Sequence, residues 1–307
     1  MRVLFYGTPD FAVPSLRALL GEGFDVAAVV TRPDKPTGRH RSHAHASAVK
    51  TVAAAEELPV LQPERPGTPE FLDAARSLAP DLAIVVAYGH ILPQALLDVP
   101  RQGSVNVHAS LLPALRGAAP IQRAILQGCT ETGVTIMRME AGMDTGPILH
   151  QVATPIAPDE TGGELSARLA ELGAEALIEA LTLMEETGLE PRPQDHARAT
   201  LAPKIAREEE RLDWTRGAED VARKIRAFDP RPGAWTSCRQ RDLKLFGAAA
   251  APEGGEPGCV LAAGDVLRVA CGSGSVTVAE VQPAGRGRMP ARAFVNGRGV
   301  AAGDRLT

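Results

Sequence analysis

The first two-thirds of the chain alternates short apolar runs with segments of helical periodicity, and this alternation restricts the possible folds more than any other feature. Buried strands are predicted for the apolar runs at 1–6, 26–30, 82–87, 104–107 and 133–139. Helices are predicted after the first run and at 46–57, 69–78 and 163–186. Such alternation is typical of an α/β fold, in which helices cover the faces of a parallel sheet.

The sequence changes in character after residue 187. Residues 188–206 contain Pro191, Pro193 and Pro203 and show little periodicity, which indicates an extended linker. A helix is then predicted at 218–228, followed by short strands at 234–237, 243–246, 258–261, 266–270 and 275–281. Short strands at this spacing favour a small β-barrel. We therefore predict domains at 1–187 and 207–307, joined by a linker at 188–206.

The two parts of the chain on either side of residue 190 differ in charge. The whole chain has a net charge of -4, but residues 1–190 hold 14 Lys/Arg against 23 Asp/Glu, and residues 191–307 hold 19 against 14. A basic second half suits contact with a polyanion such as nucleic acid. An Arg-rich and Ala-rich composition also produces basic segments without such a role, so charge alone leaves the partner open.

The cysteine content and the apolar runs bear on the cellular compartment. The four cysteines, Cys129, Cys238, Cys259 and Cys271, lie far apart without a C-x-x-C motif, which argues against a zinc site or a disulfide framework. The N-terminus lacks the apolar core of a secretory signal, and no run has the length of a membrane span. We expect a cytoplasmic protein without membrane contact, and a monomer.

Asn106 and His108 form the strongest local signal for chemistry. They lie two residues apart where a predicted strand ends, so both side chains project from the same side. An amide and an imidazole side by side can stabilise a tetrahedral oxyanion and move a proton, as acyl transfer to an amine requires. Taken alone, the pair more often forms a capped, hydrogen-bonded turn. Ser110 lies nearby but lacks a surrounding G-x-S-x-G, which argues against a serine hydrolase.

A third polar residue, Asp144, lies between Gly142 and Gly146 in a Gly-rich turn after the strand at 133–139. Its carboxylate can fix the tautomer of a nearby histidine or accept a proton from an amine. The alternative is an aspartate that only stabilises the turn or binds calcium.

The turn at Gly7 lacks the second and third glycines of G-x-G-x-x-G, which argues against NAD binding.

The segment Asn106-x-His108-x-Ser110-Leu111-Leu112-Pro113 with Arg116-Gly117, and Asp144 in its turn, resemble the formyltransferase family that uses 10-formyltetrahydrofolate. The similarity continues through residues 117–122 (GAAPIQ) and 225–230 (IRAFDP), which resemble the members that formylate the α-amino group of methionyl initiator tRNA. The resemblance implies a Rossmann-like catalytic domain, a linker, and a tRNA-binding C-terminal β-barrel similar to an OB fold.

Residue roles follow from the resemblance. It implies that Asn106 hydrogen-bonds the formyl oxygen, that His108 assists the tetrahedral intermediate, and that Asp144 orients His108 and takes part in proton transfer. The implied co-substrate is 10-formyltetrahydrofolate, with no metal. The residues implied to bind folate are Tyr88, Gly89, Ile91, Leu92, Ser110, Leu111, Leu112 and Pro113.

Residues 32–50 form a basic stretch with five Lys/Arg against one Asp. A solvated loop is the simple explanation, but the resemblance implies an insertion that enters the acceptor end of tRNA, with Arg39 and Arg41 contacting phosphates. His40, Ser42, His43 and His45 replace the lysine-rich and apolar middle of the family pattern, so individual roles stay open. His43-x-His45 has no evident third metal ligand.

Other functions leave different traces in a sequence. Glycinamide ribonucleotide formyltransferase lacks a C-terminal barrel, amino-sugar formyltransferases carry different residues after Arg116-Gly117, and formyltetrahydrofolate dehydrogenase needs a long additional domain. A noncatalytic RNA-binding module would explain a basic barrel but would not require Asn106, His108 and Asp144 together. The combination favours the members that act on initiator tRNA.

Overall fold

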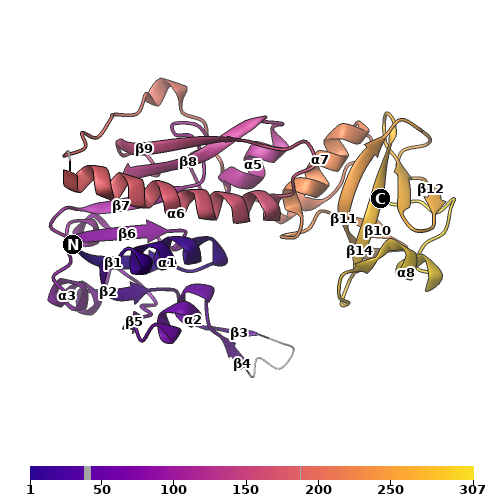
Figure 1. The fold of residues 1–307 in the computed structure, drawn as a ribbon. Helices are drawn as coiled ribbons and strands as arrows, with labels where there is room; N and C mark the ends of the chain where they lie inside the picture. The colour runs from indigo at the N-terminus through magenta and orange to yellow at the C-terminus, as the bar shows by residue number, and fades with distance from the viewer. Residues whose placement is uncertain (38–42, 187) are drawn as a thin grey trace. The chain divides into compact units, whose positions relative to one another are not determined.

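The computed structural model describes residues 1–37, 43–186 and 188–307. The described chain forms two compact units, which are drawn in Figure 1. The first unit comprises residues 1–117, 132–154 and 166–201, and the second comprises 118–131, 155–165 and 202–307. The predicted domains are continuous in sequence, whereas these units are not. Two short segments from earlier in the chain, 118–131 and 155–165, pack with the C-terminal part.

The first unit is built on a sheet whose described strands have the order β5-β2-β1-β6-β7-β8-β9 (Figure 1). The five strands from β5 to β7 are parallel, and β8 runs antiparallel to β7. The predicted α/β fold with a parallel sheet is confirmed. Strands β5 and β9 were not predicted. The strands are β1 (Arg2–Gly7), β2 (Asp25–Val30), β5 (Val60–Leu61), β6 (Leu82–Val86), β7 (Ser104–His108), β8 (Glu131–Arg138) and β9 (Ile148–Pro155).

Helices pack against both faces of this sheet. Phe71 of α3 and Leu96 of α4 share a core cluster with Leu4 and Tyr6 of β1. Gly173 of α6 lies against Val107, so α6 covers the opposite face of β7 from Asn106 and His108. The helices are α1 (Val13–Gly21), α2 (Ala48–Ala55), α3 (Pro69–Ser77), α4 (Gln94–Leu97) and α6 (Gly162–Glu186), with 3-10 turns η1 (Asp10–Ala12) and η2 (His196–Arg198).

The parallel strands bring the segments that follow them to one edge of the sheet. Tyr6 pairs with both Val30 and Val85, and Val85 also pairs with Asn106, so four strands end side by side. The strand order reverses direction between β1 and β6. Ligands of open α/β sheets bind beyond the carboxyl ends of the strands at such a reversal. The segments after β6 and β7 are therefore in position to form a site.

A short hairpin follows β2 in the first unit. Strand β3 (Lys35–Thr37) pairs antiparallel with β4 (His43–His45). Next to its base, Lys50 donates hydrogen bonds to Asp34 at 2.6 Å and to Gln62 at 2.8 Å. Residues 38–42, which include the predicted phosphate contacts Arg39 and Arg41, lie outside the described residues.

The second unit holds an antiparallel sheet in the order β10-β11-β14-β13-β12, with β15 paired to β14. The predicted C-terminal barrel is confirmed as a half-barrel sheet. Its strands are β10 (Trp235–Cys238), β11 (Arg241–Ala251), β12 (Val260–Ala263), β13 (Leu267–Ala270), β14 (Ser275–Pro283) and β15 (Met289–Pro290). Its helices are α5 (Pro120–Leu126), η3 (Arg207–Glu210), α7 (Ala218–Phe228) and α8 (Ala291–Asn296).

Two contacts explain why early segments of the chain belong to the second unit. Helix α5 packs against α7, and Arg123 of α5 donates to Glu209 at 2.6 Å. At the start of α6, the Gly163 N–H donates to the Asp229 carbonyl at 2.9 Å. A Cβ atom at Gly162 would overlap the Ala227 carbonyl oxygen, so glycine permits this close approach.

Strand β11 extends five residues beyond the predicted strand at 243–246, through Ala251. The added residues include four consecutive alanines, which have little strand propensity of their own. Pairing with β14 along this length determines their conformation. In the described residues, none of the helices combines the length and the apolar character needed to cross a membrane.

Candidate active site

Asn106 and His108 are presented by β7, which lies between β6 and β8. Asn106 pairs with Met137 and His108 with Thr135 in the antiparallel ladder to β8. Because side chains alternate along a strand, Asn106 and His108 project from the face opposite Val107 and α6. His108 is buried, with 6% of its surface exposed, whereas Asn106 is partly exposed.

The hydrogen bonds of His108 define how its ring can carry protons. Nε2 lies 3.1 Å from the Leu115 carbonyl oxygen, which accepts only, so Nε2 carries a hydrogen and donates it. In the neutral ring, Nδ1 is therefore unprotonated. Nδ1 lies 3.7 Å from Oδ2 of Asp144, which is too long for a hydrogen bond but close enough for ionic attraction. A proton taken up at Nδ1 would face the carboxylate.

Asp144 is held in a strained turn. Its φ of 52° lies in the left-handed region, which costs a non-glycine residue roughly 1 kcal/mol. Oδ2 accepts a hydrogen bond from the Gly117 N–H at 2.8 Å, and 19% of the side chain is exposed. A Cβ atom at Gly146 would overlap the Arg138 carbonyl oxygen, so this glycine is required for the tight turn. The turn and the Gly117 N–H hold the carboxylate in place, and its exposed part can still contact a ligand.

The loop after β7 is held in place by side chains from β8 and β9. Thr135 donates to the Ser110 carbonyl at 2.6 Å and accepts from the Leu112 N–H at 3.1 Å. Gln151 donates to the Leu112 carbonyl at 2.8 Å. The Ser110 hydroxyl donates to the Ala114 carbonyl at 2.6 Å, so its hydrogen serves the loop. This use supports the argument against a serine nucleophile.

The loop after β6 divides into buried and exposed residues. The Tyr88 ring packs edge-on against Tyr6 at 5.4 Å, and burial raises the pKa of Tyr88 to about 12. Leu92 is buried in the same core cluster, whereas Ile91 is 92% exposed. Tyr88 and Leu92 therefore anchor the loop, while Ile91 and the backbone at Gly89, with a φ of 84°, are free to meet a ligand.

The comparisons with known proteins assign a family to this arrangement. The family model described as Formyl transferase matches residues 1–181. The model described as Formyl transferase, C-terminal domain, matches residues 204–299. The chain belongs to the formyl transferase family.

Relatives of this formyltransferase match it over its full length. A methionyl-tRNA formyltransferase of Thiobacillus denitrificans is 49% identical over 310 residues, covering 100% of this chain and 99% of the relative. A methionyl-tRNA formyltransferase of Geobacter sulfurreducens is 46% identical over 307 residues, covering 100% of this chain and 96% of the relative.

Solved structures share the fold at low identity. The N-formyltransferase of Helicobacter canadensis, solved with folinic acid and dTDP-3-aminofucose, has a TM-score of 0.69 at 17% identity, covering 92% of this chain and 98% of that one. The methionyl-tRNA formyltransferase of Clostridium thermocellum has a TM-score of 0.58 at 14% identity, covering 82% and 94%. The fold class is that of formyltransferases.

The structure brings together the three residues assigned to catalysis. Asn106 and His108 share one side of β7, and Asp144 reaches the same histidine from another loop. The two segments assigned to folate, at 88–92 and 110–113, follow the neighbouring strands β6 and β7. Their contact with folate stays a prediction.

Sequence reasoning missed the residues that hold these loops. Thr135 and Gln151 secure the loop after β7, and Thr200 accepts from the Leu115 N–H at 2.8 Å. Gln194 hydrogen-bonds the turn that contains Asp144. Thr135 could have been found as a polar residue within the apolar run at 133–139. Gln194 and Thr200 lie in the segment interpreted as a linker, where no pattern distinguished them.

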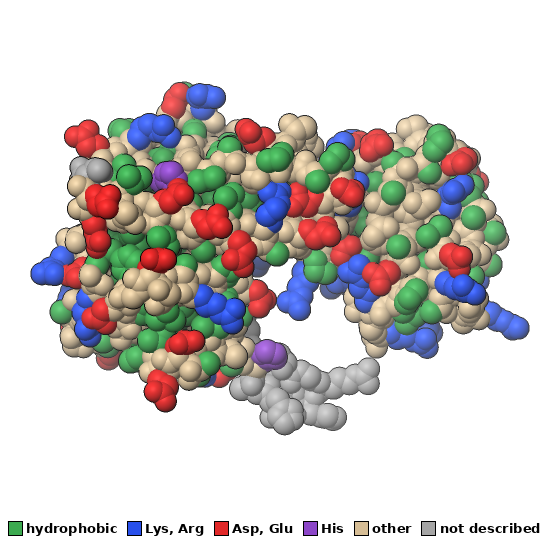
Figure 2. All heavy atoms as spheres, viewed as in Figure 1, with side chains coloured by type: hydrophobic (Ala, Val, Ile, Leu, Met, Phe, Trp, Pro, Cys, Tyr) green, Lys and Arg blue, Asp and Glu red, His purple; other side chains and the backbone are tan. Residues whose placement is uncertain are grey.

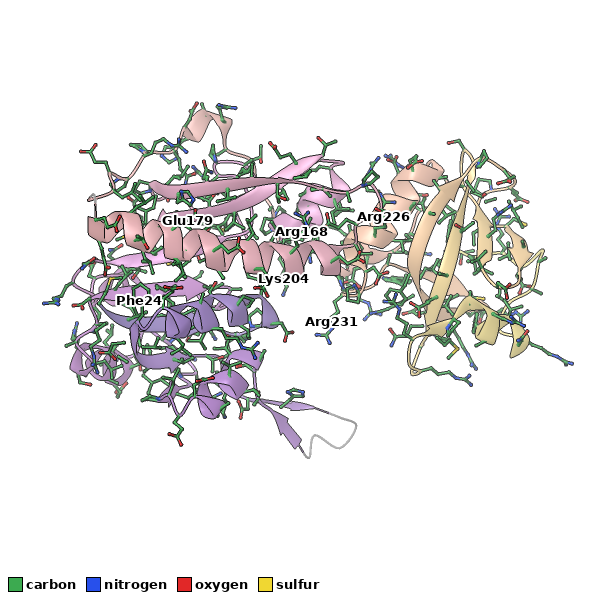
Figure 3. All side chains as sticks on the ribbon, in the orientation of Figure 1. Phe24, Arg168, Glu179, Lys204, Arg226 and Arg231 are labelled. Carbon is green, nitrogen blue, oxygen red and sulfur yellow. The ribbon has the colours of Figure 1, made fainter. Side chains whose placement is uncertain are left out.

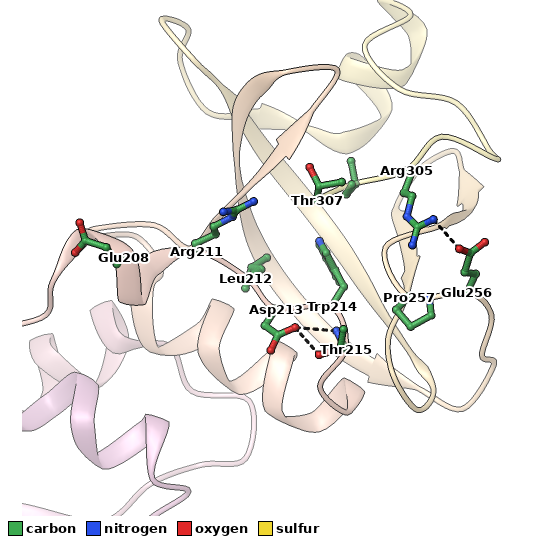
Figure 4. Close-up of a pocket in the computed structure, with 11 residues that line it drawn as sticks. Glu208, Arg211, Leu212, Asp213, Trp214, Thr215, Glu256, Pro257, Arg305 and Thr307 are labelled. Carbon is green, nitrogen blue, oxygen red and sulfur yellow. Dashed lines mark hydrogen bonds and ion pairs between the residues drawn. The ribbon is translucent and has the colours of Figure 1, made fainter.

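The second unit has a pocket of about 620 Å³ beside Trp214, shown in Figure 4. Three of its charged residues pair with close neighbours: Arg305 with Glu256 at 2.6 Å, and Asp213 with the Thr215 hydroxyl at 2.6 Å. Trp214 donates its Nε1–H to Thr236 at 3.0 Å. The described residues that line this pocket include no histidine, so it does not repeat the histidine–carboxylate arrangement of His108 and Asp144.

In the described part of the chain, no three His, Cys, Asp or Glu side chains are placed to hold a metal ion. The described cysteines are free thiols.

Proposed function

We propose that this formyltransferase transfers the formyl group of 10-formyltetrahydrofolate to the α-amino group of methionyl initiator tRNA, giving N-formylmethionyl-tRNA and tetrahydrofolate for translation initiation. The observation that carries the proposal is the convergence of Asn106, His108 and Asp144 at one edge of the sheet. The full-length relatives named methionyl-tRNA formyltransferase support the choice of acceptor.

The reaction forms one bond and breaks another at the formyl carbon. The neutral α-amine attacks this carbon. The negative charge that develops on the formyl oxygen is stabilised by the Asn106 amide, and by the positive charge that His108 gains when Nδ1 takes up a proton. The tetrahedral intermediate then releases the folate nitrogen. The amine loses one proton and the folate nitrogen gains one, so the net proton count is unchanged.

His108 and Asp144 handle that proton. With Nε2 donating to Leu115, the ring receives a proton at Nδ1, 3.7 Å from the Asp144 carboxylate, which offsets the new positive charge. The 19% exposure of Asp144 gives the amine or a bridging water access to the carboxylate. The pair carries the proton from the amine toward the departing folate nitrogen.

The folate is bound between the loops that follow β6 and β7. The exposed Ile91 side chain and the backbone at Gly89 provide contacts on one side, and residues 110–113 provide them on the other. Thr135 and Gln151 hold the second loop, so the backbone groups that meet the folate ring are preorganised. The donor is thereby placed beside Asn106 and His108.

The tRNA is bound through basic residues and not through the acidic side of α6. Figure 2 shows acidic side chains along the exposed side of α6, which carries Glu171, Glu175 and Glu179. This surface repels a polyanion. In the second unit, Lys204 and Arg231 are exposed, as the side-chain view in Figure 3 shows. These residues, with Arg39 and Arg41, contact tRNA phosphates. The enzyme acts as a cytoplasmic monomer.

The proposal is tested by transfer of labelled formyl from 10-formyltetrahydrofolate to four acceptors: methionylated initiator tRNA, methionylated elongator tRNA, glycinamide ribonucleotide and an amino-sugar nucleotide. We expect label on the initiator tRNA alone. Label on a small amine would overturn the tRNA acceptor while retaining the catalytic residues. No transfer to any acceptor would favour a noncatalytic RNA-binding protein.

A further inference from the structure

Two buried polar side chains beside the active site, Arg116 and Gln194, are only 6% exposed each. They come from segments 78 residues apart in the sequence and hydrogen-bond each other: Oε1 of Gln194 accepts from Arg116 Nε at 3.1 Å and Nη2 at 2.6 Å. Burial of such groups is costly unless their hydrogen bonds are satisfied. The two side chains satisfy each other's hydrogen bonds, which indicates that this buried contact serves a structural or functional role.

The other end of the Gln194 amide holds the turn that carries Asp144. Its Nε2 donates to the Asp144 carbonyl at 2.9 Å and to the Gly146 carbonyl at 2.6 Å. An arginine can only donate and a carbonyl can only accept, so the amide has one chemically sensible orientation. Both amide hydrogens and the amide oxygen are used, which fixes the backbone on either side of the Asp144 side chain.

The residues on either side of Arg116 complete the arrangement. The Leu115 carbonyl accepts from His108, and the Gly117 N–H donates to the Asp144 carboxylate. Arg116, between them, is bound to Gln194. Three consecutive residues thus hold the imidazole, the amide of Gln194 and the carboxylate. A shift of Gln194 would move the Asp144 turn relative to the segment that positions His108.

We propose that Gln194 is a positioning residue for the transfer reaction, which acts by setting the separation between the Asp144 carboxylate and His108. This inference rests on the proposed function, because the separation matters only if the pair moves a proton during transfer. Gln194 does not touch the reacting atoms. Its effect on rate must therefore pass through Asp144.

The experiment is a double-mutant cycle that combines Gln194→Met with Asp144→Asn. Methionine has a similar volume but cannot form the four hydrogen bonds. We expect Gln194→Met to lower the single-turnover transfer rate by roughly 10- to 100-fold, the scale of a misplaced catalytic group, with KM for both substrates changed by less than about threefold. In the Asp144→Asn background the same change should lower the rate by less than about twofold.

The matched control is Gln102→Met, at an exposed glutamine before β7, which should transfer at the wild-type rate. If Gln194→Met does not fold, Gln194→Glu replaces it, since it keeps the acceptor for Arg116 but loses both donors. Equal rate losses with and without Asp144, or a wild-type rate, would overturn the positioning role.

Failure of the positioning role of Gln194 can be distinguished from failure of the proposed function. If the wild type formylates another amine, the cycle is run with that acceptor, and the role of Gln194 is judged there while the tRNA assignment is abandoned. If the wild type transfers formyl to no amine, both proposals are overturned.

Discussion

Asp144 in the first unit and Asp229 in the second both accept a backbone N–H and lie beside a basic side chain, but their pairing differs. Asp229 is 5% exposed, accepts from Arg288 at 2.7 Å and accepts from the Gly247 N–H at 3.0 Å. Arg288 also lies over the Phe246 ring at 4.2 Å. Asp144 accepts from Gly117 and lies 3.7 Å from His108.

This difference separates a structural carboxylate from one suited to chemistry. Asp229 is buried against the Arg288 guanidinium and the Gly247 N–H, so it can hold α7 against the sheet but is not open to a substrate. Asp144 faces the His108 imidazole, a group that can both accept and donate a proton, across 3.7 Å. A buried aspartate is therefore informative about function only once its partners are known.

The largest expected effect is on the chemical step. Asp144→Asn and, separately, His108→Ala should lower the transfer rate by roughly a hundredfold or more, the scale of a lost acid-base or oxyanion group. Their melting temperatures should stay close to that of the wild type. Rapid-quench transfer assays with 10-formyltetrahydrofolate measure the rate. Unchanged turnover in either variant would remove the distinction between the two aspartates.

Asp229→Asn should instead affect stability. Loss of the buried carboxylate leaves Arg288 without its main partner, which should lower the free energy of unfolding by about 2 kcal/mol. The transfer rate per folded molecule should change little. Urea unfolding measures the loss, and Asp265→Asn is the control, because its ion pair with Arg292 has side-chain exposures of 83% and 70%. Equal losses for both variants would contradict a structural role for Asp229.

Replacing Arg39 and Arg41 with serine should affect neither aspartate. We expect KM for tRNA to rise roughly tenfold and the salt dependence of tRNA use to fall by about two units in the log–log slope, one per lost phosphate contact. Folate binding should be retained. Steady-state assays between low and moderate salt measure both. The control replaces the exposed Arg65 and Arg76 with serine, which removes the same charge elsewhere on the surface. A comparable rise in KM for tRNA in that control would exclude a specific contact.

The smallest effect concerns a surface carboxylate in the second unit. The hydrogen bond from Arg123, with the Ala206 N–H, lowers the pKa of Glu209 to about 2 from its ordinary 4.5. Because the folded-state pKa is lowered, the stabilisation is complete above pH 4.5 and is lost as pH falls toward 2. With 40% of the side chain exposed, its contribution is about 0.5 kcal/mol.

Glu209→Gln should therefore lower the free energy of unfolding slightly and equally at pH 7 and pH 5. The difference from the wild type should shrink at pH 3.5. Urea titrations at the three pH values measure it, and a difference that grows on acidification would contradict the assignment.

The sequence was a good guide where local patterns determine structure. Apolar runs and helical periodicity located four of the five parallel strands, all but β5, and the two-residue spacing of Asn106 and His108 placed them on one side of β7. The spacing could not reveal that α5 packs with α7, because that contact depends on surfaces of helices almost 100 residues apart. Strand β9 was missed for a similar reason: its apolar and polar residues alternate weakly, and its pairing stabilises it.

By itself, the sequence determined the α/β alternation, the chemistry available at Asn106, His108 and Asp144, and the charge contrast between the two parts of the chain. The tertiary structure decided how those groups can act. It placed Nδ1 of His108 3.7 Å from Asp144 and folded Gln194, from an apparent linker, against the Asp144 turn. The physical reason is that hydrogen bonds between distant segments depend on sub-ångström placement by the whole packed unit, which no local pattern records.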